Sequence, residues 1–179
     1  WDRSTPRYVE ASGEAEMHGL FQERRYTDFL PIVLPTEERV ERMLAGTSHP
    51  PDEMVGKLRP TIGMEHWHFD VEKVAVNAVM AGAAPEHFPV ILALASSGDT
   101  GRQSSMSSMG NMVLVNGPIR HEIGMNSGIG AMGPYNYANS VIGRAFGLLS
   151  QNLQGGSVPG VTYAGSQGCN FSYNCITFA

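Results

Sequence analysis

Four stretches of the chain carry apolar residues at helical spacing, and each begins or ends at a residue that starts or stops helices. The pattern predicts helices from Thr36 to Gly46, from Asp70 to Gly82, from Pro85 through Leu94, and from Tyr135 to about Leu153. The second helix is apolar on nearly all sides, so we expect it to be buried.

Shorter apolar runs predict strands. Residues 111–115 form a run that is typical of a buried strand, and Asn116-Gly117-Pro118 stops it. Val161–Tyr163 and Ser172–Phe178 are further strand candidates. Helices and strands together predict a single α/β (or α+β) domain over residues 36–179, with buried helices around a small mixed sheet.

The first 35 residues differ from the rest in pattern. Pro6, Pro31 and Pro35 interrupt them, and charged residues dominate between residues 10 and 25. We predict an extended N-terminal arm that runs over the surface or reaches a neighbouring subunit. Its apolar segment 29–35 ends in proline, which suits docking better than a central strand.

The amino-acid composition indicates that part of the protein's surface is covered. Charged residues make up only 16% of the chain, below the roughly 25% that is usual for soluble domains. We therefore predict a homo- or hetero-oligomer. The net charge of −5 disfavours nucleic-acid and membrane-surface partners, and no apolar run approaches the ~20 residues of a membrane span. The 10 methionines favour a reducing, cytoplasmic location.

The strongest candidate site lies between the strand at 111–115 and the helix after Pro134. A loop from Gly124 to Gly133 leads into that helix, whose free N–H groups would attract an anion. Arg120 would clamp a carboxylate or phosphate of the substrate. The other predicted substrate-binding residues are Asn116, Gly117, Asn126, Ser127 and Gly128. The glycines fit equally well an alternative in which they only permit tight turns and close helix packing.

Two familiar site types are not expected here. Gly128-x-Gly130-x-x-Gly133 matches the dinucleotide fingerprint literally, but no strand directly precedes it and no acidic residue follows about 20 residues later. A P-loop lysine is also missing, so we expect no nucleotide cofactor. The sequence lacks the G-x-S-x-G elbow of a serine nucleophile.

Two histidines suggest a metal site. His66 and His68 would point to the same side of an extended chain and offer two imidazoles to a divalent transition metal, Zn, Fe, Mn or Cu. His121 and Glu122 would add ligands or acid–base groups. In the alternative interpretation the two histidines lie on a polar face while the intervening aromatic residues fill the core. The isolated His87 is predicted to be a surface or capping residue.

These candidates together predict a subunit of a metal-dependent enzyme, of hydrolase or lyase type, that acts on a small anionic or polar organic substrate. Arg120, His121 and Glu122 would be its catalytic residues. Two alternatives stay open. One is a non-catalytic structural or regulatory subunit of a hetero-oligomeric complex. The other is a thiol-redox protein that uses Cys169 and Cys175, whose spacing matches neither a C-x-x-C motif nor a zinc knuckle.

Several sequence strings carry a family resemblance: Ala75-Val76-Asn77-Ala78-Val79-Met80-Ala81-Gly82, Pro85-Glu86-His87-Phe88-Pro89-Val90, Val115-Asn116-Gly117-Pro118-Ile119-Arg120 and Asn126-Ser127-Gly128. Over roughly residues 70–160 the chain resembles the bacterial UGSC family of (seleno)proteins. The thiol or selenol motif that gives this family its name is absent from the chain. The resemblance therefore implies that a redox centre would lie on another chain or another segment.

Overall fold

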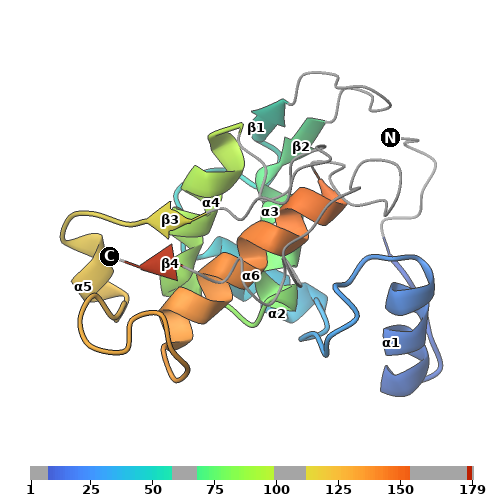
Figure 1. Ribbon diagram of the computed structural model, residues 1–179. Helices are drawn as coiled ribbons and strands as arrows, with labels where there is room; N and C mark the ends of the chain where they lie inside the picture. The colour runs from blue at the N-terminus through green and yellow to red at the C-terminus, as the bar shows by residue number, and fades with distance from the viewer. Residues whose placement is uncertain (1–7, 58–67, 99–111, 154–176, 179) are drawn as a thin grey trace, which may run out of the picture.

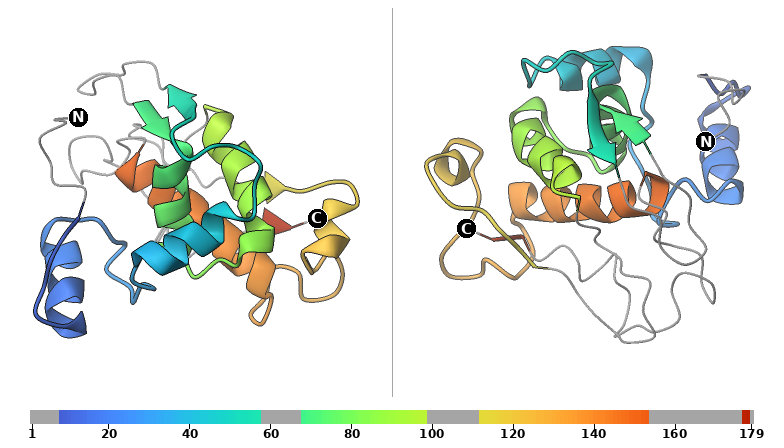
Figure 2. Two further views of the ribbon diagram at one scale, coloured as in Figure 1. Left: turned by 180° about the vertical axis from the view of Figure 1, so that it is seen from behind. Right: turned by 90° about the horizontal axis from the view of Figure 1, so that it is seen from above.

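Three apolar helices pack on one another at the centre of the molecule. The computed structural model describes residues 8–57, 68–98, 112–153 and 177–178. Its central helices are α3 (Val71–Met80), α4 (Phe88–Ser96) and α6 (Tyr137–Asn152) (Figure 1). A further helix, α2 (Glu37–Leu44), packs on α3, so that α3 lies between α2 and α6 (Figure 2).

Helix α3 follows directly from its sequence. The Asp70 carboxylate accepts a hydrogen bond from the backbone N–H of Lys73 at 2.9 Å and thereby caps the first turn. Gly82, at φ +83°, takes the left-handed conformation that ends the helix. Seven of its ten residues are buried, including an asparagine, as the apolar character on nearly all sides predicts.

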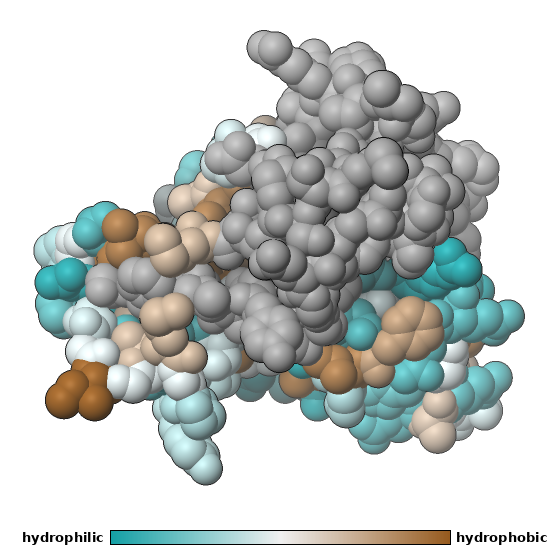
Figure 3. Space-filling view, viewed as in Figure 1, coloured by the Kyte–Doolittle hydropathy of each residue, from teal (hydrophilic) through white to brown (hydrophobic). Residues whose placement is uncertain are grey.

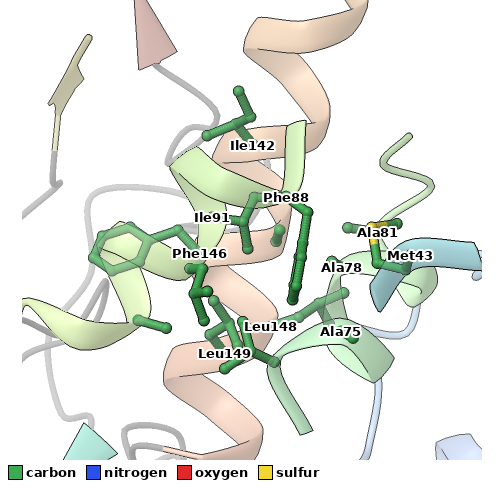
Figure 4. Close-up of a cluster of buried hydrophobic side chains, with 14 of the residues drawn as sticks. Met43, Ala75, Ala78, Ala81, Phe88, Ile91, Ile142, Phe146, Leu148 and Leu149 are labelled. Atoms are coloured by element: carbon green, nitrogen blue, oxygen red, sulfur yellow. The ribbon is translucent and has the colours of Figure 1, made fainter. Parts of the chain in front are cut away.

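Phe88 is the centre of the core. Its ring, fully buried, extends from α4 between Ala78 of α3 and Leu148 of α6 (Figure 4). Burying a large apolar side chain of this kind stabilises the fold by about 1.5–3 kcal/mol. Because α3, α4 and α6 all contribute to this core, it fixes the ends of these helices relative to one another.

The four predicted helices are present, with small differences at their ends. Thr36 occupies the N-cap position of α2, although its side chain makes no capping hydrogen bond. A short 3₁₀ helix, η1 (Pro85–His87), precedes α4. Helix α6 begins at Tyr137 rather than Tyr135, because Tyr135 has a φ of +72° that no right-handed helix accommodates.

The strands differ from those predicted. β1 (Met54–Lys57) pairs antiparallel with β2 (His68–Asp70), a pairing that we did not predict. β3 (Val113–Leu114) pairs in parallel with β4 (Thr177–Phe178). Instead of one mixed sheet, the described residues thus contain two sheets of two strands. The mixed α/β fold class is confirmed. The candidate strand Val161–Tyr163 lies outside the described residues.

The N-terminal segment contains a helix where we predicted an extended arm. Helix α1 (Glu14–Glu23) buries none of its residues fully and lies at the side of the helical core, against which its partly buried Phe21 packs (Figure 2). The backbone N–H of Ser12 donates a hydrogen bond to the Glu16 carboxylate at 2.7 Å, which holds the first turn. This pair of residues is the sequence signal that would have indicated the helix.

After α1 the chain is extended and lies along α6 of the same molecule. Asp28 forms an ion pair with Arg144, and the side chain of Ile32 joins the core. The side chain of Gln151 donates hydrogen bonds to the backbone carbonyls of Arg25 and Thr27. Within the apolar segment 29–35, Ile32 is buried in this chain's own core, whereas Phe29, Leu30 and Val33 are exposed, so docking of the segment to another subunit stays a prediction. Across the described ranges, no helix is long and apolar enough to span a membrane.

Candidate functional site

The predicted catalytic residues lie on a short helix that we did not expect. Helix α5 (Ile119–Glu122) carries Arg120, His121 and Glu122 directly after the turn that ends β3. The Nε–H of Arg120 donates a hydrogen bond to Nε2 of His121 at 3.1 Å, so this ring nitrogen is unprotonated in the contact. His121 and Glu122 are exposed. The predicted substrate-binding loop follows this helix directly: the backbone N–H groups of Gly124 and Met125 donate hydrogen bonds to the carbonyls of His121 at 3.2 Å and Arg120 at 2.8 Å.

The predicted substrate-binding loop is held in place by asparagines. Nδ2 of Asn126 donates to the carbonyl of Ile129 at 3.1 Å and to Oδ1 of Asn136 at 2.9 Å. Oδ1 of Asn126 accepts from the backbone N–H of Gly128 at 2.9 Å. Because all these polar groups are engaged inside the loop, Asn126 shapes the loop. The neighbouring Ser127 is exposed.

Two further asparagines, which the sequence analysis missed, tie this loop to α6. Nδ2 of Asn136 donates to the carbonyls of Gly130 at 2.6 Å and Gly133 at 3.0 Å. The buried Asn139 both donates to the carbonyl of Asn126 and accepts from its backbone N–H, each at 3.0 Å. The loop is therefore preformed, and it fixes the position at which α6 begins.

The start of α6 borders a cleft that we name the arginine cleft. Its volume is about 460 Å³, and it lies between α2, the turn after α3 and the first residue of α6. The cleft is lined by Val33, Arg39, Arg42, Met43, Val79, Gly82, Ala83, Ala84, Pro85 and Tyr137. The volume is in the range that holds a small molecule.

Two arginines give the arginine cleft its charge. Arg39 and Arg42 project from α2, and none of the lining residues is acidic. Nη1 of Arg39 donates to the carbonyl of Leu34 at 2.9 Å, which fixes this guanidinium. Within the part of the chain that the structure describes, Arg42 has no hydrogen bond or ion pair. Sequence reasoning missed both residues because charges on an amphipathic helix are usual on its solvent-facing side; their spacing of three residues was the available signal.

Tyr137 also lines the arginine cleft. Its hydroxyl donates a hydrogen bond to the carbonyl of Gly82 at 2.5 Å and so connects α6 to the end of α3. Burial raises the pKa of Tyr137, and the negative charge of Glu86 raises it further. The hydroxyl is therefore neutral at physiological pH and keeps its proton on Gly82.

His87 packs behind Tyr137, with the two ring centroids 5.2 Å apart. The side chain is only 2% exposed, so the expectation of a surface position was wrong, while the expected capping role is correct. Its Nδ1 accepts a hydrogen bond from the backbone N–H of Ala84 at 3.0 Å. Burial lowers the pKa of His87, against the opposing effects of Glu86 and of a hydrogen bond to the backbone of Ile123. The imidazole is therefore neutral at physiological pH.

The buried imidazole of His87 leads to a prediction about pH. Its pKa in the folded protein is below the ordinary value of 6.5, so on acidification the unfolded chain takes up this proton first. The free energy of unfolding should accordingly be highest above pH 6.5 and fall as the pH drops towards the folded-state pKa. Urea unfolding at a series of pH values, compared between the wild type and His87→Gln, isolates this contribution. An identical pH slope in the two proteins would contradict it.

The described residues add no further ligand to the metal site predicted at His66 and His68. His68 lies exposed on β2 next to the buried Phe69, which agrees with the polar-face interpretation. No group of three or more His, Cys, Asp or Glu side chains in the described ranges is placed to hold a metal ion. His66 and both cysteines lie outside those ranges, so the metal and redox hypotheses stay predictions. Asn116 and Gly117 follow β3, with Gly117 at φ +94°.

The loop before α6 also exposes apolar side chains. Ile129 and Tyr135 are fully exposed, and Met132 is 69% exposed. Leu114 of β3, on the same side of the molecule, is more than half exposed. Figure 3 shows apolar surface along this edge, beside β3 and the loop. Large exposed apolar groups on a preformed loop are typical of a surface that contacts another protein.

No family model, curated protein or solved structure matches this chain. The resemblance of residues 70–160 to the UGSC family therefore stays a prediction.

Proposed function

We propose that this protein is an enzyme subunit that binds a small organic anion in the arginine cleft. The observation that carries the proposal is the pair of guanidinium groups, Arg39 and Arg42, in a cleft with no acidic lining residue. Guanidinium groups bind carboxylates and phosphates through charged, often paired hydrogen bonds. The site also borders the first residue of α6, the helix whose N-terminus the sequence predicts as the anion site.

The rest of the lining supports an organic ligand. Val33, Met43, Val79 and Pro85 contribute apolar groups to the lining of the same cleft. Ligand sites commonly combine a mostly apolar wall with a few polar groups that set the ligand's orientation. The arginine cleft thus suits a molecule with a short carbon skeleton and an anionic end.

The proposed reaction, metal-dependent hydrolysis or lyase chemistry, rests on the sequence and needs its own test. In the hypothesis drawn from the sequence, His66 and His68 hold the metal, and Arg120, His121 and Glu122 act on the substrate. The last three residues are not among those that line the arginine cleft. Elemental analysis of the purified protein should find Zn, Fe, Mn or Cu at a stoichiometric level, lost in the variant that combines His66→Ala and His68→Ala. Equal metal content in the variant and the wild type would remove this part of the proposal.

A second candidate function is that of a structural or regulatory subunit. The observation in its favour is the fully exposed pair Ile129 and Tyr135 on a loop that three asparagines hold in shape. A preformed loop binds a partner without the cost of ordering itself. Both functions are compatible with a protein that works inside an oligomer.

The binding proposal is tested by measuring the affinity for small carboxylates. Isothermal titration calorimetry of the full chain with succinate and with butyrate should detect binding of at least one of them. Replacing Arg42 with glutamine should weaken that binding roughly 10- to 100-fold, because a charged hydrogen bond is lost. Arg24→Gln is the matched control, since Arg24 is exposed at the end of α1, outside the cleft, and the net charge changes equally. No binding of either acid by the wild type would refute the proposed function.

A further inference from the structure

The two arginines of the cleft project from one helix at a spacing that suits two anionic groups on one ligand. Arg39 and Arg42 are three residues apart on α2, and both line the same cleft. Residues at this spacing lie on one helix face with Cβ atoms roughly 5–6 Å apart. Their side chains therefore present two positive charges to a single bound molecule.

Arg39 and Arg42 are the two charged residues in the lining of the arginine cleft, and no acidic residue of the lining balances their charge. Arg39 uses one of its five N–H donors on the carbonyl of Leu34, which leaves most of its guanidinium fork for a ligand. Arg42 has neither a hydrogen bond nor an ion pair within the described ranges. A ligand with one negative charge would leave the second guanidinium uncompensated, whereas a ligand with two would satisfy both.

Tyr137 lines the same cleft and differs from the arginines in its hydrogen-bonding role. The proton of the Tyr137 hydroxyl is directed to the carbonyl of Gly82, so the hydroxyl oxygen faces a ligand only as an acceptor. The favourable partners of an anionic ligand group in this cleft are therefore the two guanidinium groups rather than Tyr137.

We propose that the ligand of the arginine cleft is a short-chain organic dianion, with both anionic groups bound by Arg39 and Arg42. The apolar residues Val33, Met43 and Val79 contact the carbon skeleton that joins the two groups. This inference rests on the proposed function, because it names the class of anion that the same cleft binds.

Calorimetric titration of the full chain at low ionic strength tests the inference with three probes. Succinate carries two carboxylates, butyrate has the same number of carbons with one carboxylate, and sulfate is a dianion without a carbon skeleton. Succinate should bind at least about tenfold more tightly than butyrate, since the second arginine gains a charged hydrogen bond only with the dianion. It should also bind more tightly than sulfate, which lacks the apolar contact.

Variants separate the two arginines from general charge effects. Arg39→Gln and Arg42→Gln should each reduce the affinity for succinate to about that for butyrate. Arg42→Lys keeps the positive charge, and its affinity for succinate should lie between those of the wild type and Arg42→Gln. Arg24→Gln should leave all three affinities unchanged, and thermal unfolding shows that each variant is folded.

Three outcomes would overturn the inference. Equal affinities for succinate and butyrate would show that one anionic group is enough, and the proposed function would survive. Sulfate binding as tightly as succinate would remove the role of the carbon skeleton. Loss of succinate binding in Arg24→Gln as large as in Arg42→Gln would show that only the net charge matters. If neither carboxylate binds the wild type, the proposed function fails together with the inference.

Discussion

Replacing Arg144 with methionine is expected to lower the free energy of unfolding by about 3–5 kcal/mol. Nε and Nη2 of Arg144 donate to the two carboxylate oxygens of Asp28, at 3.1 and 3.0 Å, and Nη2 also donates to the carbonyl of Pro31. The Asp28 side chain is fully buried and that of Arg144 is 21% exposed. Methionine can fill much of the same space, but it leaves a buried carboxylate without a partner. Urea unfolding followed by circular dichroism measures the loss.

A double variant distinguishes the lost pair from a general packing defect. Combining Asp28→Leu with Arg144→Met removes the orphaned charge together with its partner, so the double variant should be more stable than Arg144→Met alone. A double variant that is even less stable than the single one would show that packing, rather than the charge, explains the effect. A loss of under about 1 kcal/mol in Arg144→Met would contradict the prediction itself.

The helices of the core could be predicted because their signals are local. Apolar spacing together with the cap at Asp70 and the stop at Gly82 indicates α3 without any knowledge of its neighbours. The same holds for α2, α4 and α6. The pairing of β1 with β2 escaped prediction because it depends on a contact between separate segments, in which Phe69 packs over Gly56. A glycine in a short polar stretch gives no hint of the ring that covers it.

The candidate site shows the same division between local and distant information. The glycine-rich entry to α6 is visible in the sequence, and the structure adds that Asn136 and Asn139 hold it in shape. The arginine cleft itself was not predictable, because its walls meet only after folding. The hydroxyl of Tyr137 bonds to Gly82, 55 positions earlier in the chain. Arg39, on a helix that reads as solvent-exposed, faces the same cleft.

Replacing Gly46 with alanine is expected to destabilise the fold and to disturb the arginine cleft at the same time. A Cβ at this position would lie 2.2 Å from the carbonyl oxygen of Pro85 and 2.9 Å from its carbonyl carbon. Both atoms belong to the backbone of η1. The Pro85 carbonyl also accepts a hydrogen bond from the backbone N–H of Phe88. No side-chain rotation can therefore relieve the clash. Overpacking of this kind costs about 1–3 kcal/mol, and more where the neighbour is backbone.

The control for this variant is Gly19→Ala in α1. No atom lies within 4 Å of a Cβ at Gly19, and alanine favours the helix over glycine by about 1 kcal/mol, so this change should be neutral or stabilising. Thermal unfolding should therefore shift in opposite directions for the two substitutions. Gly46→Ala must also separate the end of α2 from η1, which moves Arg39 and Arg42 relative to Pro85, another residue that lines the arginine cleft. The affinity for succinate should consequently fall in Gly46→Ala and stay unchanged in Gly19→Ala. A stable Gly46→Ala variant that binds succinate as tightly as the wild type would show that α2 and η1 are not held together as described.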